Sequence, residues 1–241
     1  MQLKGKTVFI TGGTGGIGRP LVALLQAAGA DIHVYDQKRQ GDLVENCDQI
    51  CHTLREHTPD ILINMAGFNA FDYCENQDLT RIIALNMMVP LRLSQAVLPG
   101  MKQRGSGQII NVGSMTALIP LPHLTGYVAA KAGLKGFSDA LRREVAGTAI
   151  TITHIVPRAV RTGMNTGTRA EINDKTGVTY DDPAMVAARI FRAIIRHERE
   201  VRIGFPERLF ALIQSFCPTL IDKGLQKNRI IGEDILRQQK T

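Results

Sequence analysis

The chain has 241 residues, of which 44% are hydrophobic and 21% are charged, a balance typical of a soluble globular protein with a substantial core. It carries a net charge of +7, and most of this excess lies in residues 189–241, which hold 11 basic and 6 acidic residues. Because the two signs are interleaved and the chain has no Trp, we expect no nucleic-acid partner.

The four cysteines do not form the paired pattern of a disulfide framework. Cys47 and Cys51 are spaced like two ligands on one helical face, but no second ligand pair follows them, so no metal site is expected. The chain enters an apolar segment at Thr7, which leaves no space for a secretory leader, and no apolar run approaches the ~20 residues that span a bilayer. These features favour a cytoplasmic protein with reduced thiols.

The N-terminal region predicts a strand, a glycine-rich turn, a helix and a second strand that ends at an acid. The expected elements are a strand at Lys6–Ile10, the turn at 11–18, a helix at Ile17–Ala28 and a strand at Asp31–Tyr35 followed by Asp36. Glycines at 12, 16 and 18 let backbone amides approach a pyrophosphate, and the N-terminus of the following helix favours the anion. This order indicates a dinucleotide-binding βαβ unit.

Strands and helices continue to alternate along the rest of the chain. Further strands are expected at Asp60–Ile63, around Ile109 and at Ile150–Val156, and Asp42–Leu43 is interpreted as the end of a short additional strand. Helices are expected at Asp48–His57, at Leu79–Arg104 with a kink at Pro90, and at Gly126–Val145. The pattern predicts one doubly wound α/β domain of the Rossmann type, with a mostly parallel sheet of about seven strands and helices on both faces.

Tyr127 and Lys131 are four residues apart on a predicted helix, so their side chains leave the same face. A phenol exchanges protons poorly near neutral pH unless a neighbour stabilises its anion, and an ammonium group can do so. Ser114 follows a short apolar run, so its hydroxyl is expected near the carboxyl end of a buried strand, where open α/β sheets bind ligands. The three residues together indicate acid–base chemistry.

The chain resembles the short-chain dehydrogenase/reductase family over about residues 3–205. The motifs that match, in the order and approximate spacing of the family, are Thr11-Gly12-x-x-x-Gly16-x-Gly18, Asn64-Met-Ala-Gly67, Asn86, Ser114, Tyr127 and Lys131. The resemblance implies hydride transfer between a nicotinamide cofactor and an alcohol/ketone pair. It also implies four catalytic residues: Tyr127 as general acid/base, Ser114 holding the substrate oxygen, Lys131 binding the nicotinamide ribose and lowering the pKa of the tyrosine, and Asn86 supporting a water-linked proton relay.

The same resemblance implies the residues that bind the cofactor. They are Gly12, Thr14, Gly16, Ile17, Gly18, Asp36, Asp42, Leu43, Asn64, Ala66, Gly67, Tyr127, Lys131, Pro157, Val160 and Thr162. Asp36 ends the second strand, where a carboxylate accepts hydrogen bonds from ribose hydroxyls and repels a 2′-phosphate. Lys38 and Arg39 favour the opposite preference, but solvent screens them. We therefore expect NAD(H), with NADP(H) as the alternative.

Three departures from the family pattern stand out. The interval from Asp36 to Asn64 spans only 28 residues, so a helix is expected to be missing, and Asp42, with Asp48 behind it, is the candidate for the adenine-contacting acid. Arg158 stands where the family has a small residue beside the nicotinamide, so it either reaches an anionic group or narrows the pocket. Met65 replaces an Asn in a turn that is held mostly by its backbone.

Beyond residue 205 the resemblance fades, and residues 206–241 are interpreted as a helical extension of a domain formed by residues 1–205. An apolar stripe is expected to close over the core or the substrate cleft, at Leu209, Phe210, Leu212, Ile213 and Phe216, continued by Leu220, Ile221 and Leu225. Nearby Lys223, Lys227 and Arg229 keep peripheral membrane contact through 206–229 open as the disfavoured alternative.

The sequence therefore predicts an oxidoreductase that acts on a small-molecule alcohol or ketone, and an apolar or lipid-like substrate is expected. An NADPH-dependent ketone reductase of the 3-oxoacyl type is one alternative, and a non-catalytic nucleotide-binding protein is another. The two long helices, at about 79–104 and 126–147, are more apolar than one face against a sheet requires. As in the family, they are expected to pair with their copies in a homodimer or homotetramer.

Overall fold

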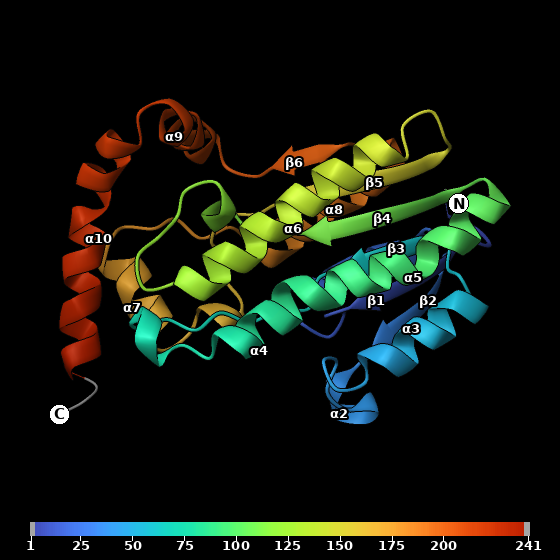
Figure 1. The fold of residues 1–241 in the computed structure, drawn as a ribbon, viewed down its shortest axis with the longest axis horizontal. Helices are drawn as coiled ribbons and strands as arrows, with labels where there is room; N and C mark the ends of the chain where they lie inside the picture. The colour runs from blue at the N-terminus through green and yellow to red at the C-terminus, as the bar shows by residue number, and fades with distance from the viewer. Residues whose placement is uncertain (1–2, 239–241) are drawn as a thin grey trace.

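A computed structural model describes residues 3–238 of the chain. Figure 1 shows a twisted sheet with helices on both faces, and the C-terminal helices lie beyond the carboxyl ends of the strands. The strands are β1 (Thr7–Thr11), β2 (Asp31–Tyr35), β3 (Ile61–Asn64), β4 (Gly107–Val112), β5 (Ile150–Val156) and β6 (Glu200–Arg202). They are all parallel, in the order β2-β1-β3-β4-β5-β6, which confirms the predicted doubly wound fold.

The helices alternate with the strands as the sequence predicts. They are α1 (Gly18–Ala27), α2 (Gln37–Gln40), α3 (Cys47–Glu56), α4 (Leu79–Ile83), α5 (Val89–Arg104), α6 (Thr125–Glu144), α7 (Thr168–Lys175), α8 (Pro183–Arg196), α9 (Phe205–Phe216) and α10 (Pro218–Gln238). Two strands, β2 and β5, have the predicted bounds, and most other predicted ends lie within two residues of the observed ones.

Two hydrophobic clusters sandwich the sheet, because successive side chains of a strand point to opposite faces. On β1, Val8 and Ile10 join the cluster that packs under α1 and α8, whereas Phe9 packs against the cluster on the other face. That second cluster includes buried side chains of α3, α5 and α6. Burial on both faces explains why the strands read as continuous apolar runs.

The described residues contain six strands, so the prediction of about seven is wrong by one. Asp42 and Leu43 form a turn, in which the Asp42 carboxylate accepts hydrogen bonds from the backbone amides of Val44 and Glu45 at 2.8 and 3.3 Å. The chain then enters α3, so β2 is the edge of the sheet. The short interval was expected to lack a helix, but it holds both α2 and α3, and the element it lacks is a strand.

The predicted long helix at 79–104 is interrupted by one π-helical turn at Ala84–Met88, directly before Pro90. Proline has no N–H to bond the carbonyl four residues earlier, that of Asn86, so the predicted kink has a local cause. By length and composition this 26-residue helix could cross a membrane, contrary to our expectation that no run comes near that length. Its side chains Leu93 and Val97 are fully buried in the core, which is the environment of a core helix.

The C-terminal helices do not bury the predicted stripe. Leu209, Leu212, Phe216 and Leu220 are more than half exposed, and Phe210 is nearly so. The expectation that the stripe packs inward is therefore wrong for most of α9, and it holds for Ile221 of α10. Helix α10 instead packs on the body of the fold through Gly232, where an added Cβ would lie 2.6 Å from the ring of His123.

Candidate active site

The glycine-rich turn between β1 and α1 forms the floor of a groove of about 820 Å³ at the carboxyl ends of the strands. An added Cβ on Gly18 would lie 2.2 Å from the Gly12 carbonyl oxygen, so the turn closes only with glycine there. Gly12 itself has φ 75°, and its Cβ would lie 2.8 Å from the amide nitrogen of Ala66. The turn therefore leaves a cradle of backbone at the N-terminus of α1, suited to an anionic ligand.

Most of the predicted cofactor-binding residues line this groove or the cavity that continues from it. The groove is lined by Gly12, Thr14, Gly16, Ile17, Gly18, Asp42, Leu43, Ala66, Gly67 and Thr162. The cavity adds Tyr127, Lys131, Pro157 and Val160. Thr162 packs directly on the glycine turn, because a Cβ on Gly16 would lie 2.5 Å from its methyl carbon.

Backbone contacts hold the turn after β3 beside the glycine turn. The Thr11 hydroxyl accepts hydrogen bonds from the amides of Met65 and Ala66, both at 3.2 Å. The Asn64 side chain lies in neither hollow: its amide donates to Asn111 Oδ1 at 2.9 Å and to Ser94 Oγ at 3.2 Å in the buried core. Asn64 thus supports the turn, and the replacement of the family's Asn by Met65 leaves the backbone contacts intact.

The two acids predicted to contact the adenosine occupy different places. Asp42 lines the groove, but its carboxylate forms an ion pair with Arg81, which holds its pKa below the usual value. Asp36 lies in a neighbouring recess, where its carboxylate accepts a 2.9 Å hydrogen bond from the Lys38 amide and caps α2. Three cations line that same recess: Arg19, Lys38 and Arg39.

The catalytic candidates meet where the groove opens into a second hollow, a cavity of about 450 Å³. Tyr127 and Lys131 lie on one face of α6, both buried, with the Lys131 Nζ 5.7 Å from the centroid of the Tyr127 ring. Lys131 donates a 3.0 Å hydrogen bond to the Val112 carbonyl at the end of β4. Ser114, two residues beyond β4, faces the phenol closely enough for their hydrogen bond to lower the pKa of Tyr127. The structure therefore brings Ser114, Tyr127 and Lys131 together, as predicted.

Burial dominates the protonation of these groups. The pKa of Tyr127 is raised, because desolvation outweighs the opposing effects of the Ser114 hydrogen bond and of the positive charge of Arg169. Desolvation also lowers the pKa of Lys131 to about 8. The positive charge of Arg169, a residue the sequence did not single out, is one of the two influences that lower the pKa of Tyr127. That Lys131 also lowers this pKa stays a prediction.

Asn86 lies behind this site, fully buried in the π-helical turn. Its side-chain amide donates hydrogen bonds to the carbonyls of Phe68 at 2.9 Å and Ile82 at 3.0 Å. A Cβ on Gly67 would lie 2.5 Å from Asn86 Oδ1 and 3.6 Å from Lys131 Nζ, so Asn86 and Lys131 converge on the same glycine. Asn86 thus holds the loop at Gly67 and Phe68, which lies beside Lys131.

The cavity is mostly apolar, and its apolar side chains come from regions far apart in the chain. These include Met115, Ile119, Leu121, Leu124, Val178 and Leu225. Leu225 and Asn228 belong to α10, so the C-terminal extension forms part of the cavity wall. An apolar molecule of moderate size fits such a lining.

Two arginines also line the cavity. Arg158 forms a two-point ion pair with Asp181, at 3.0 and 2.7 Å, and a further one with Glu207 of α9 at 3.2 Å. The sequence left two roles open for Arg158, reaching an anionic group or narrowing the pocket. The described contacts favour the first, and the anionic groups are carboxylates of the chain itself. Arg169, on α7, was missed by sequence reasoning, since it stands in a polar stretch with no motif around it.

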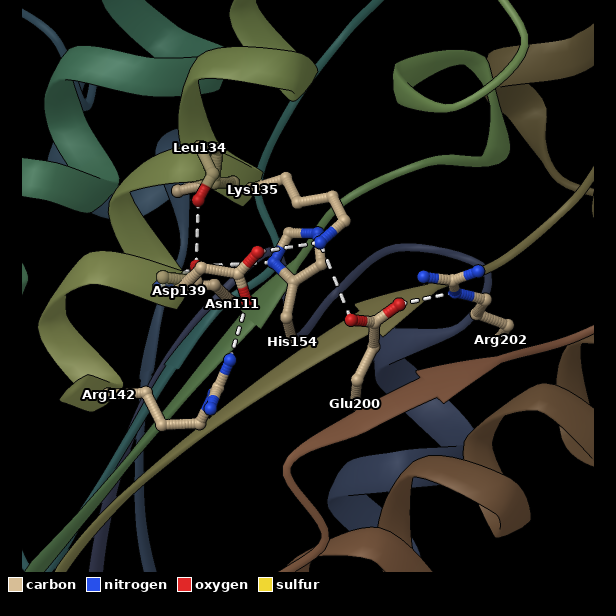
Figure 2. A network of polar contacts seen from close by, with 9 residues as sticks. Asn111, Leu134, Lys135, Asp139, Arg142, His154, Glu200 and Arg202 are labelled. Atoms are coloured by element: carbon tan, nitrogen blue, oxygen red, sulfur yellow. Dashed lines mark hydrogen bonds and ion pairs between the residues drawn. The ribbon is translucent and has the colours of Figure 1, made fainter. Parts of the chain in front are cut away.

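A polar network further along α6, on the side that faces β4, β5 and β6, ties this helix to the sheet (Figure 2). Lys135 pairs with Asp139 at 2.7 Å and with Glu200 of β6 at 3.4 Å, and Figure 2 shows these ion pairs beside the ring of His154. The Ser138 hydroxyl lies 3.2 Å from His154 Nδ1 and accepts a 2.9 Å hydrogen bond from Asn111. Burial lowers the pKa of His154 to about 4, so the imidazole is neutral at physiological pH.

The chain is similar in sequence to a protein-family model and to known proteins of the same kind. The short chain dehydrogenase family model matches residues 40–173. The 3-oxoacyl-acyl-carrier-protein reductase FabG of Vibrio harveyi is 31% identical over 206 residues, covering 76% of this chain and 83% of the reductase. Dehydrogenase/reductase SDR family member 7B of Danio rerio is 27% identical over 239 residues, covering 83% of this chain and 77% of its own.

Solved structures share the fold. A short-chain dehydrogenase from Sphingobium yanoikuyae in complex with NADPH superposes with a TM-score of 0.75 at 25% identity, covering 90% of this chain and 95% of its own. A short chain dehydrogenase from Burkholderia cenocepacia in complex with NADP superposes with a TM-score of 0.79 at 21% identity, covering 94% of this chain and all of its own.

Proposed function

Because the chain belongs to the short-chain dehydrogenase family, we propose that its groove holds a nicotinamide cofactor and that Tyr127 exchanges the proton of an alcohol/ketone pair in the cavity. The chain is an NAD(P)-dependent oxidoreductase of that family. The observation that carries the assignment of roles is the burial of Tyr127 beside Ser114 and Lys131 at the junction of groove and cavity.

The residues present fit the cofactor. Only glycine is accommodated at Gly12 and Gly18, and the backbone that they expose suits a pyrophosphate at the N-terminus of α1. Thr162 covers the turn from the other side, and Lys131 lies within reach of a ribose at the inner end of the groove. When bound, the cofactor supplies or accepts the hydride.

The protein residues handle the proton. A raised pKa keeps the Tyr127 phenol protonated at neutral pH, so it acts as the general acid when a ketone is reduced and accepts the proton back in the reverse direction. The Ser114 hydroxyl hydrogen-bonds the substrate oxygen beside it. Lys131 stabilises the phenolate that forms, since its positive charge lies across the ring of the tyrosine. Asn86 supports a water-linked route for the proton behind Lys131.

Tyr127→Phe tests these roles. The variant keeps the ring and loses the proton, so we expect kcat to fall by about 10²- to 10⁴-fold while cofactor binding changes little. Tyr73→Phe serves as a control, because it removes a phenol from a residue that lines neither the groove nor the cavity. A Tyr127→Phe variant that keeps most of its kcat would contradict the assignment, and it would favour a non-catalytic nucleotide-binding protein.

For the cofactor we propose NAD(H), on the support of the Asp36 carboxylate at the end of β2. Its negative charge repels a 2′-phosphate, and its oxygens can accept hydrogen bonds from the ribose hydroxyls. NADP(H) is the second candidate, favoured by Arg19, Lys38 and Arg39 in the same recess and by relatives solved with NADP or NADPH. The ratio of kcat/KM for the two cofactors tests the choice: Asp36→Ala should shift it toward NADP(H), and a wild-type preference for NADP(H) would contradict our proposal.

For the substrate we propose an apolar or lipid-like alcohol or ketone, supported by the lining of the cavity. A 3-oxoacyl reductase is a second candidate, favoured by the name of the Vibrio harveyi relative. Turnover of ketones of graded chain length, with a 3-oxoacyl thioester alongside, separates the two. A preference for the thioester over every free ketone would support the second.

We further propose a cytoplasmic homodimer or homotetramer. Four free cysteines, two of them exposed, suit a reducing compartment. For assembly through the helices at 79–104 and 126–147, support comes from the exposed Leu79 and Met88 on the first and from the small exposed residues Ala132 and Ala140 on the second. Light scattering at micromolar concentration tests it, and a monomeric mass would contradict it.

We propose that residues 206–241 form an extension that covers the substrate side of a domain formed by residues 1–205. The presence of Leu225 and Asn228 in the cavity wall supports this proposal. Peripheral membrane contact through 206–229 is the second candidate, favoured by the exposure of Leu212 and Phe216. Cosedimentation with anionic vesicles tests it, and a Leu212→Ser/Phe216→Ser variant should abolish any binding.

A further inference from the structure

Arg169 lies in the wall of the catalytic cavity, and beyond its effect on the pKa of Tyr127 it has no role in the chemistry described so far. It stands on the first turn of α7, and its guanidinium carbon lies 6.0 Å from the centroid of the Phe71 ring. Its positive charge acts on the Tyr127 phenol, so the guanidinium lies close to where the substrate oxygen reacts. A cation at this point faces the substrate.

No carboxylate among the described residues forms an ion pair with Arg169. The contrast with Arg158 in the same cavity is direct, because Arg158 is bound by both Asp181 and Glu207. The Nε of Arg169 is buried and has no hydrogen-bond partner within residues 3–238. Burial lowers the pKa of Arg169, and only two tyrosines, Tyr127 and Tyr180, oppose that effect. Arg169 is partly buried, and a partly buried cation without a counter-ion is stabilised when an anionic ligand binds to it.

The other two cations that line the cavity already have hydrogen-bond partners among the described residues. Lys131 donates to the Val112 carbonyl, and the carboxylate of Glu207 is shared with Arg158. Glu207 Oε2 is buried and has no hydrogen-bond partner among the described residues, so it adds an acceptor on the α9 side of the cavity for a hydroxyl or amide of a ligand. The planar guanidinium matches the two oxygens of a carboxylate with parallel hydrogen bonds.

We infer that Arg169 binds a carboxylate of the substrate, which makes the substrate pair an oxo acid and a hydroxy acid with an apolar body. The inference rests on the proposed function of the site. The carboxylate takes no part in the redox step: the carbonyl gains a hydride from the cofactor and a proton from Tyr127, and the acid group stays unchanged. Arg169 therefore determines specificity and orientation.

A phosphate of the cofactor is a second source of the same anionic chemistry. Arg169 lines the catalytic cavity and does not line the groove of the glycine turn, which favours the substrate. Replacing Arg169 separates the two sources. The binding of oxo acids weakens if Arg169 binds the substrate, and the binding of the cofactor weakens if it binds a cofactor phosphate.

The test compares straight-chain oxo acids of graded length with their methyl esters, which keep the carbonyl and lose the charge. Dissociation constants are measured for the protein with oxidised cofactor bound, so the result does not depend on turnover, and kcat/KM is measured for each compound. We expect wild type to bind the acids about 10- to 100-fold more tightly than the esters.

Three variants sharpen the comparison. Arg169→Met keeps an apolar stem against Phe71 and should lose the preference for acids, with ester binding little changed. Arg169→Lys should keep part of the preference. Lys175→Met removes an exposed cation from the same helix, one that pairs with Glu171, and should behave as wild type.

Equal binding of acids and esters by wild type, or no binding of either, would overturn the inference. So would an equal loss for both compounds in Arg169→Met, which would make the residue structural, or a loss of cofactor affinity alone, which would assign it to the cofactor. The proposed function is judged separately, by the dependence of ketone and ester turnover on Tyr127.

Discussion

Helices α6 and α9 carry the same kind of sequence pattern and occupy opposite environments. Both repeat large apolar residues at helical spacing, and the sequence predicts a buried face for each. On α6, Leu134 is fully buried and Leu141 nearly so. On α9, Leu212 is 55% exposed and Phe216 is 78% exposed.

The difference follows from what lies beneath each helix. Helix α6 packs on β5, so the sheet itself receives its apolar face (Figure 1). Helix α9 lies beyond the carboxyl end of β6, where no strand continues, and it contacts α10. An apolar stripe thus shows which face of a helix is suited to packing. Whether another element packs against that face depends on the whole fold.

The largest expected effect tests this contrast directly. Leu134→Ala should lower the free energy of unfolding by about 2–5 kcal/mol, because it leaves a cavity in a closed core. Leu212→Ala makes the same chemical change on an exposed site and should stay within about 0.5 kcal/mol. Urea unfolding of both variants measures the difference. Equal losses would mean that α9 is covered in solution, by a second copy or another surface.

A pH effect of intermediate size concerns the buried network under α6. His154 has a pKa of about 4 in the folded protein and about 6.5 unfolded. Between these values the His154 imidazole is protonated in the unfolded chain and neutral in the folded protein. The free energy of unfolding should therefore fall as the pH drops from about 6.5 to 4. The loss reaches at most about 3 kcal/mol, and above pH 6.5 this group contributes no pH dependence.

His154→Gln is neutral at every pH and should flatten that part of the profile. The matched control is His52→Gln, which changes an exposed imidazole on α3 and should leave the slope unchanged. Urea unfolding at pH 7.5, 6 and 5 supplies the measurement. Parallel profiles for wild type and His154→Gln would show that the imidazole is accessible to protons in the folded state.

The smallest expected effect concerns the attachment of α9. Glu207→Gln weakens the ion pair with Arg158 that ties the first turn of α9 to the cavity wall. Because the pair is partly exposed, global stability should change by about 1 kcal/mol or less. Limited proteolysis, followed by mass spectrometry, should nevertheless cut α9 faster than in wild type. Glu171→Gln, which breaks an exposed pair with Lys175, is the control, and equal cutting rates in both variants would contradict the role of Glu207.

Much of the fold was predictable because its signals are local. Apolar runs bounded by turn residues gave the positions of five of the six strands, and the proline at 90 gave the kink. The short strand β6 has no such run, and Asp42–Leu43 was misread as a strand, since two residues beside a glycine cannot distinguish a turn from a strand end. Part of the predicted catalytic group was also a local signal, because a spacing of four residues along a helix brings Tyr127 and Lys131 to one face.

The sequence by itself determined the order of the elements, the glycine turn and the acid–base pair, since each depends on contacts between residues close in the chain. The tertiary structure alone decided where Arg158 and Arg169 differ: the first meets Asp181 and Glu207, and the second meets no carboxylate among the described residues. The sequence singled out Arg158 by its place in a motif, but nothing near either arginine in the sequence identifies a carboxylate partner. A charge finds its counter-ion through the packing of distant elements, and only that packing leaves one guanidinium free to receive a ligand.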